Sequence, residues 1–140
     1  MTSISASQSA ADELPTVGSV ERLHPDIDAL ISPSASIEVL AKGFKWSEGP
    51  VWIPNGDGGL PPQSLLFSDI PNNRIHCWNT QSGLSVFLEP AGFTGPASYG
   101  KERGSNGLAL DTKGRLLCCE HGDRRISVLE KNGGKRTLAD

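Results

Sequence analysis

The feature of this sequence that most constrains its fold is an internal repeat with an offset of 51 residues. Three stretches recur at this offset: Ser64-Leu-Leu-Phe-Ser-Asp as Arg115-Leu-Leu-Cys-Cys-Glu, Arg74-Ile75 as Arg125-Ile126, and Gly83 as Gly134. A sequence that repeats at such a spacing builds one supersecondary unit more than once, and each unit buries its apolar face against a neighbour. The repeat therefore predicts two equivalent modules rather than one irregular domain.

Short apolar runs closed by turn residues divide each module into strands. We expect strands at residues 49–53, 64–69, 74–78 and 84–88 in the first module and at 107–110, 115–120, 125–129 and 136–138 in the second, with a further candidate at 37–41. The leading strands lie 58 residues apart, because the first module has a long loop at 55–63 where the second has a tight turn. Four short strands in about 50 residues are typical of a β-propeller blade. We therefore predict an all-β fold in which residues 36–140 form two four-stranded antiparallel blades.

Two blades do not make a closed propeller, which needs roughly four blades or more. Each end of such a pair leaves a sheet face without a neighbour. We therefore expect an incomplete propeller, the N-terminal piece of a longer protein. The alternative is a small two-sheet sandwich that is complete in itself.

Residues 1–35 are expected to form a flexible N-terminal tail. The first 18 residues are rich in Ser and Ala and show no hydrophobic period. Residues 20–33 have apolar positions that suit one face of a short helix, which Pro25 and Pro33 limit in length. These apolar positions are Val20, Leu23, Ile27 and Leu30.

Composition restricts the class of partner. The formal net charge is −3, so there is no basic field to recruit nucleic acid or anionic lipid. No apolar run approaches the length that spans a bilayer, and the N-terminus lacks the features of a signal peptide. Cys77, Cys118 and Cys119 show no metal-type spacing, and adjacent strand residues point to opposite faces, so we expect three reduced, buried thiols. We predict a cytoplasmic protein with neither a nucleic-acid nor a membrane partner.

In a propeller, the first strand of each blade lines the central channel, and the residues before it lie at the channel mouth. Glu48 lies at this mouth in the first blade, where a carboxylate is a natural ligand for a hard cation such as Ca²⁺. The simpler interpretation is an acid at the end of a strand that is only solvated. Asn106 precedes the leading strand of the second blade. It is interpreted either as a residue of a pocket at the same mouth or as part of an Asn-Gly turn. His121 is expected beside Asn106, either in the pocket or as a structural histidine. Asp69 and Asp111 border turns, so we expect them to cap turn backbone.

Several motifs, in this order, resemble the gluconolactonase/regucalcin (senescence marker protein) family, and most closely its bacterial and fungal gluconolactonase branch. The motifs are Ser47-Glu-Gly-Pro-Val-Trp, Leu65-Leu-Phe-Ser-Asp-Ile-Pro-Asn-Asn-Arg-Ile, Ser105-Asn-Gly-Leu-Ala-Leu-Asp and Cys119-Glu-His-Gly-Asp-Arg-Arg-Ile. The resemblance covers about residues 36 to 140 and does not extend to residues 1–35.

The resemblance implies a six-bladed propeller that holds one divalent metal in its channel and hydrolyses sugar lactones and related esters. It implies that Glu48, in the Glu-Gly-Pro motif, is a metal ligand. The other ligands of the family follow Ser-Pro-Asn-Asp-like and Pro-Asp-Gly-like motifs of later blades, and neither motif occurs in this sequence. By motif order Asn106 is at most a substrate-pocket residue. Paraoxonase-type lactonases carry paired histidines at what look like the positions of Asn106 and His121, and only the second is His here.

The hypothesis that follows is that this sequence is the N-terminal part of a metal-dependent lactonase. We expect this part to be inactive alone. The metal is expected to be Ca²⁺, with Zn²⁺ and Mn²⁺ as alternatives, because the implied ligands are all oxygens. No residue is assigned as a catalytic acid or base. The alternatives are a non-catalytic propeller that serves as an interaction scaffold and a degenerate gene product without a stable fold.

Overall fold

The computed structural model describes residues 14–96 and 100–140. Contacts within the chain define two units, one that ends at Lys42 and one that runs from Gly43 to Asp140. The described part of the first unit contains a 3-10 helix, η1 (Pro25–Ala29), and an isolated bridge between Thr16 and Glu38. Within the described ranges we find no helix of the length and apolar character needed to cross a bilayer.

One expectation for the first unit is wrong, and another is met only in part. The segment 37–41 is not a strand, because it pairs with another segment only at Glu38. The short helix expected over 20–33 is reduced to η1, in which no residue is buried. Leu23 and Leu30 are 85% and 86% exposed, so two of the four apolar positions that predicted the helix are not packed in the described structure. Residues 1–13 of the expected tail lie outside the described residues.

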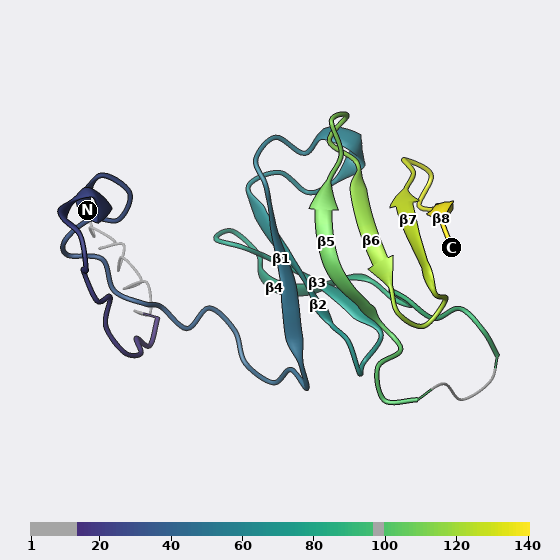
Figure 1. Cartoon of the computed structure of the whole chain (residues 1–140), viewed down its shortest axis with the longest axis horizontal. Coiled ribbons are helices and arrows are strands. Elements are labelled where there is room, and N and C mark those ends of the chain that lie inside the picture. The colour runs from purple at the N-terminus through teal and green to yellow at the C-terminus, as the bar shows by residue number, and fades with distance from the viewer. Residues whose placement is uncertain (1–13, 97–99) are drawn as a thin grey trace, which may run out of the picture. The chain divides into compact units, whose positions relative to one another are not determined.

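The second unit is built from two four-stranded antiparallel sheets (Figure 1). The first sheet has the order β1 (Ser47–Ile53), β2 (Ser64–Asp69), β3 (Arg74–Asn79) and β4 (Gly83–Leu88). The second has the order β5 (Ser105–Leu110), β6 (Leu116–Glu120), β7 (Arg125–Leu129) and β8 (Lys135–Ala139). Each strand pairs with the next one along the chain, as in a propeller blade. The all-β class and the two blades are thereby confirmed.

The two sheets share their strand registers as well as their strand order. Equivalent cross-strand pairs are Asp69 with Arg74 and Glu120 with Arg125, and Ile75 with Leu88 and Ile126 with Ala139. The irregularities recur too, since β3–β4 and β7–β8 have a register shift at the same place, as do β1–β2 and β5–β6. Insertion in the first copy is confined to the β1–β2 connection, which contains the 3-10 helix η2 (Asp57–Gly59). The repeat in the sequence is therefore a repeat in structure.

The main apolar core lies between the two sheets. It contains Ile53, Leu66, Ile75 and Cys77 from the first sheet and Leu116, Cys118 and Leu129 from the second. Leu66, Ile75 and Leu116 are completely inaccessible to solvent. Burial of each such aliphatic side chain stabilises the fold by about 2 kcal/mol relative to exposure. One blade thus provides the apolar surface that the other needs.

Asn73 fixes the start of the connection from the first blade to the second. Its Oδ1 accepts hydrogen bonds from the backbone N–H groups of Ala91, Gly92 and Phe93, at 3.1, 2.8 and 3.1 Å. Its backbone has a φ of 57°, a left-handed conformation that Asn tolerates better than most residues. Arg124, which is 51 residues later, has the same φ. The turn geometry repeats, whereas the side-chain clamp belongs to the first blade alone.

Apolar side chains remain exposed on the faces that have no neighbouring sheet. Trp52 of β1 is 48% exposed, and Ile126 of β7 is 42% exposed. Ile75, the counterpart of Ile126 in the first blade, is fully buried in the interface between the sheets. The open face of the second sheet thus corresponds to the covered face of the first, and a further blade would pack there in a larger propeller.

The three cysteines are free thiols, but the expectation that all three are buried is wrong. Cys77 and Cys118 lie in the core between the sheets, whereas Cys119 is exposed. The difference follows from strand alternation, because Cys118 and Cys119 are neighbours in β6 and point to opposite faces. Burial raises the pKa of the Cys118 thiol to about 11, which keeps it protonated at neutral pH.

Native-state alkylation tests this arrangement. Iodoacetamide followed by mass spectrometry should modify Cys119 first, because it is the accessible thiol and thiolate is the reactive form. Cys77 and Cys118 should react only when denaturant is added, and the denatured chain provides the control in which all three react. Modification of Cys118 as rapid as that of Cys119 in the native protein would contradict the burial of Cys118.

Candidate functional site

Glu48 and Asn106 occupy the same position in consecutive blades. Glu48 is the second residue of β1, and Asn106 is the second residue of β5. Each is followed by a glycine, and in each strand a register shift begins at or just before this residue. Since β1 and β5 are the first strands of their blades and lie side by side, the two oxygen-bearing side chains belong to one end of the inner strands (Figure 1).

Gly49 allows the backbones of β1 and β5 to approach at this point. Its φ is +61°, and a side chain on Gly49 would collide with the carbonyl group of Asn106. The hydroxyl of Ser68, which lies opposite Glu48 on β2, donates a hydrogen bond of 2.8 Å to the same carbonyl. The packing of the blades therefore requires a glycine directly after Glu48, whatever the role of Glu48 itself.

Glu48 is partly buried, and its carboxylate has no hydrogen bond or ion pair within residues 14–96 and 100–140. Asp69, the acid at the end of β2, does have hydrogen-bond partners. Asp69 accepts hydrogen bonds from the backbone N–H groups of Lys45 and Trp46, both at 3.2 Å, and from the side-chain amide of Asn72 at 2.7 Å. A carboxylate that loses solvent without gaining a partner is the one that a cation would stabilise.

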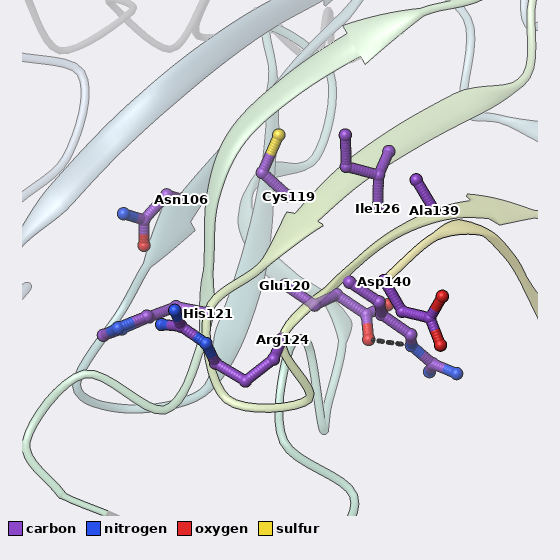
Figure 2. Close-up of a pocket in the computed structure, with 9 residues that line it drawn as sticks. Asn106, Cys119, Glu120, His121, Arg124, Ile126, Ala139 and Asp140 are labelled. Carbon is purple, nitrogen blue, oxygen red and sulfur yellow. Dashed lines mark hydrogen bonds and ion pairs between the residues drawn. The ribbon is translucent and has the colours of Figure 1, made fainter.

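Asn106 and His121 line one cavity of about 370 Å³ on the second blade, and Figure 2 shows both at the left of the view, on the side away from Ile126 and Ala139. The amide oxygen of Asn106 is buried and has no hydrogen-bond partner among the described residues. The Nδ1 atom of His121 lies 3.6 Å from a carboxylate oxygen of Glu102, and its backbone N–H donates to the carbonyl of Gly104. The structure thus brings together two of the three residues singled out from the sequence, and places Glu48 on the neighbouring strand.

Glu120 is a buried acid that the sequence analysis missed. Its carboxylate forms ion pairs with Arg125 at 2.7 Å and with Lys135 at 2.8 Å, and it accepts a short hydrogen bond from the Ser127 hydroxyl. Lys135 also donates to the carbonyl of Ala91, in the connection between the blades. Although Glu120 also lines the cavity, all of these partners are structural, so we assign it to the fold. The signal that identifies it is its position 51 residues after Asp69.

Asp111 caps the backbone of its turn, as expected, whereas the expectation for Asp69 is wrong, because the backbone N–H groups that it accepts from belong to Lys45 and Trp46, far from it in sequence. Asp111 accepts hydrogen bonds from the N–H groups of Lys113 and Arg115, at 2.8 and 2.9 Å. The bond from Arg115 is the largest of the influences that lower the pKa of the Asp111 carboxyl. The group therefore stays ionised at neutral pH and serves the β5–β6 turn.

The described residues do not form a complete metal site. Within residues 14–96 and 100–140, no three His, Cys, Asp or Glu side chains gather in a way that could hold a metal ion. A hard cation such as Ca²⁺ takes about six to eight oxygen ligands. Glu48 can provide one of them, so most of the coordination sphere would have to come from outside the described residues.

Comparison with known proteins gives two curated relatives. A gluconolactonase from Zymomonas mobilis subsp. mobilis is 36% identical over 125 residues, which is 88% of this chain and 33% of that protein. The NHL repeat-containing protein 3 of Homo sapiens is 30% identical over 87 residues, which is 62% of this chain and 21% of that protein. No protein-family model matches the chain.

Two solved structures resemble the fold. One is the X-ray structure of a protein proposed to be a gluconolactonase, with a TM-score of 0.66, 30% identity, and coverage of 84% of this chain and 35% of that chain. The other is a gluconolactonase from Xanthomonas campestris, with a TM-score of 0.64, 25% identity, and coverage of 93% of this chain and 36% of that chain. The chain thus spans about a third of the length of the gluconolactonases that it matches.

The structural assignment of Glu120 is tested by Glu120→Gln. Removal of the charge leaves Lys135, whose side chain is 9% exposed, without its counter-ion, so the free energy of unfolding should fall by about 3 kcal/mol. The matched control is Glu130→Gln, which breaks the more exposed pairs with Arg115 and Arg136 and should cost less than about 1 kcal/mol. Urea unfolding measures both. Equal losses in the two variants would show that the Glu120 network does not stabilise the blade.

Proposed function

We propose that this chain, which belongs to the gluconolactonase family and matches part of the length of its relatives, contributes two blades and one metal ligand to a metal-dependent sugar lactonase. The observation that carries the ligand assignment is the state of Glu48. It is a partly buried carboxylate with no partner among the described residues, at the end of a strand that lines the channel of a propeller. The 36% identity to a gluconolactonase supports the substrate class, a small-molecule lactone.

Glu48 would hold the metal through its carboxylate oxygens. The metal we propose is Ca²⁺ rather than Zn²⁺ or Mn²⁺, because the ligand that this chain offers is a carboxylate, and carboxylate oxygens are hard ligands. A bound divalent cation would polarise the lactone carbonyl and stabilise the oxyanion that forms on hydrolysis.

Asn106 and His121 would orient the substrate. The buried amide oxygen of Asn106 has an unused acceptor site, which a sugar hydroxyl can satisfy by donating a hydrogen bond. His121 lines the same cavity and lies within reach of Glu102, which restricts the orientation of its ring. Neither residue is assigned as the general base.

The scaffold alternative is less well supported. A protein-binding propeller needs no acid without a partner at the end of an inner strand, and such an acid costs stability unless it serves a ligand. We further propose a reducing compartment such as the cytoplasm, in keeping with the three free thiols.

Activity should depend on blades that this chain does not contain. The 140-residue chain alone should hydrolyse no glucono-δ-lactone above background, because Glu48 cannot hold a metal by itself. A chimera in which residues 36–140 replace the aligned segment of the Zymomonas mobilis gluconolactonase should be active and should lose activity to a chelator.

In that chimera, Glu48→Gln should lower kcat/KM by about two orders of magnitude and weaken Ca²⁺ binding in parallel, since loss of a ligand costs at least as much as loss of its supporting contacts. Glu130→Gln, which removes an acid from an outer strand pair, should leave both unchanged. Unchanged activity in the Glu48→Gln chimera would exclude Glu48 as a ligand.

A further inference from the structure

A second cavity, of about 450 Å³, opens next to the start of β1. It is lined by Lys45, Trp46, Pro71, Gly100, Lys101, Glu102 and Arg103. A volume of this size suits a small-molecule ligand. A smaller cavity of about 310 Å³ shares three of these residues and is bounded on its other side by His121. The cavities therefore form a series that runs from β1 to the residues that line the site on the second blade.

The larger cavity has an excess of positive charge. Lys45, Lys101 and Arg103 line it together with one acid, Glu102, which lies 3.6 Å from His121. None of the three cationic side chains forms an ion pair anywhere in the described parts of the chain. The Nε atom of Arg103 is in addition buried and without a hydrogen-bond acceptor. Arg103 lines the cavity and is partly buried, and an anionic ligand there would give its guanidinium the counter-ion that the described residues do not provide.

A line of backbone hydrogen bonds holds the walls of this cavity to both blades. The N–H of Ile70 donates to the carbonyl of Trp46 at 3.2 Å, that of Gly104 to Ile70 at 2.9 Å, and that of His121 to Gly104 at 3.2 Å. Because Trp46 and Gly104 belong to this line, the residues beside them, Lys45 and Arg103, have fixed anchor points. The cavity is thus tied to the scaffold that also positions His121.

The ends of the cavity lie close in sequence to the proposed site. Trp46 precedes Glu48 by two residues, and Arg103 precedes Asn106 by three. The ring of Trp46 is 52% exposed and lines the cavity, where it offers a flat apolar surface of the kind on which sugar rings pack. A ligand that reaches from the Glu48–Asn106 end of the strands into this cavity would pass over an aromatic ring and end among cations.

We propose that this cavity binds the anionic substituent of the substrate, so that the preferred substrates are sugar lactones that carry a phosphate or a carboxylate. The inference rests on the proposed lactonase function for its choice of sugar lactone. The requirement for an anion rests on the unpaired Lys45, Lys101 and Arg103 alone. Arg103 provides the buried donor, and the two lysines add charge at the more exposed wall.

Equilibrium binding tests the anion requirement without any dependence on catalysis. Glucose 6-phosphate, glucuronate and glucose are titrated into the 140-residue chain and into the chimera, and binding is followed by calorimetry and tryptophan fluorescence. At least one of the two anions should bind about tenfold more tightly than glucose, and added salt should weaken that preference. The two anions separate a phosphate site from a carboxylate site. Equal affinity for all three sugars in the folded chimera would overturn the proposal.

Two substitutions locate the effect. Arg103→Met and Lys101→Met keep the length of the side-chain stem and remove the charge, so each should reduce the preference for the anion severalfold. Lys131→Met, at an exposed position in the β7–β8 turn, is the matched control and should have no effect. Loss of preference in the control, or its retention in Arg103→Met, would contradict the assignment.

Kinetics of the chimera connect the cavity to turnover. The ratio of kcat/KM for 6-phosphogluconolactone or glucuronolactone to that for glucono-δ-lactone should fall about tenfold in Arg103→Met. If anions bind as expected but no lactone is hydrolysed, the proposed function fails and the anion site stands. If lactones are hydrolysed with no preference for a charged one in binding or in kcat/KM, the anion site fails and the proposed function stands.

Discussion

The close approach of β1 and β5 is the constraint on which the rest of the second unit depends. Gly49 makes it possible, because any side chain there would meet the backbone of Asn106. The apolar residues of the two sheets can then interdigitate, and the Ser68 hydroxyl can satisfy the Asn106 carbonyl that the contact buries. The same contact brings Glu48 and Asn106 to one end of adjacent inner strands. The packing that stabilises the pair of blades therefore also positions the residues proposed for chemistry.

The strand-end acids show how one position in a repeat can serve the fold in two ways. In the first blade, Asp69 is short and caps the backbone at Lys45 and Trp46. In the second blade, Glu120 reaches further and pairs with Arg125 and Lys135. Both acids are buried and both hold a blade together, but by different partners. A repeat therefore conserves the need for a buried acceptor at this place and leaves open which donors meet it.

The repeat was enough to predict the strands, their order and the equivalence of the blades, because periodic burial and turn residues are local properties of the sequence. It was not enough for the environment of individual side chains. Cys119 was expected to be buried, as its first-blade counterpart Ser68 is, but no sheet covers that face of the second blade. Lys135 reaches Ala91 across 44 residues, a contact that no local pattern contains. The segment 37–41 has the composition of a strand but pairs only at Glu38.

Three polar groups near the start of β1 and β5 have no partner among the described residues, and they are the strongest argument that this region has a function. Elsewhere in the described unit, the buried acids Asp69 and Glu120 have hydrogen-bond partners, whereas the Nδ1 of His76 in β3 has none. Near the start of β1 and β5, the carboxylate of Glu48, the amide oxygen of Asn106 and the Nε of Arg103 do not. Under the proposals made above, a metal ion would meet the acid, a substrate hydroxyl would meet the acceptor, and an anionic substituent would meet the donor.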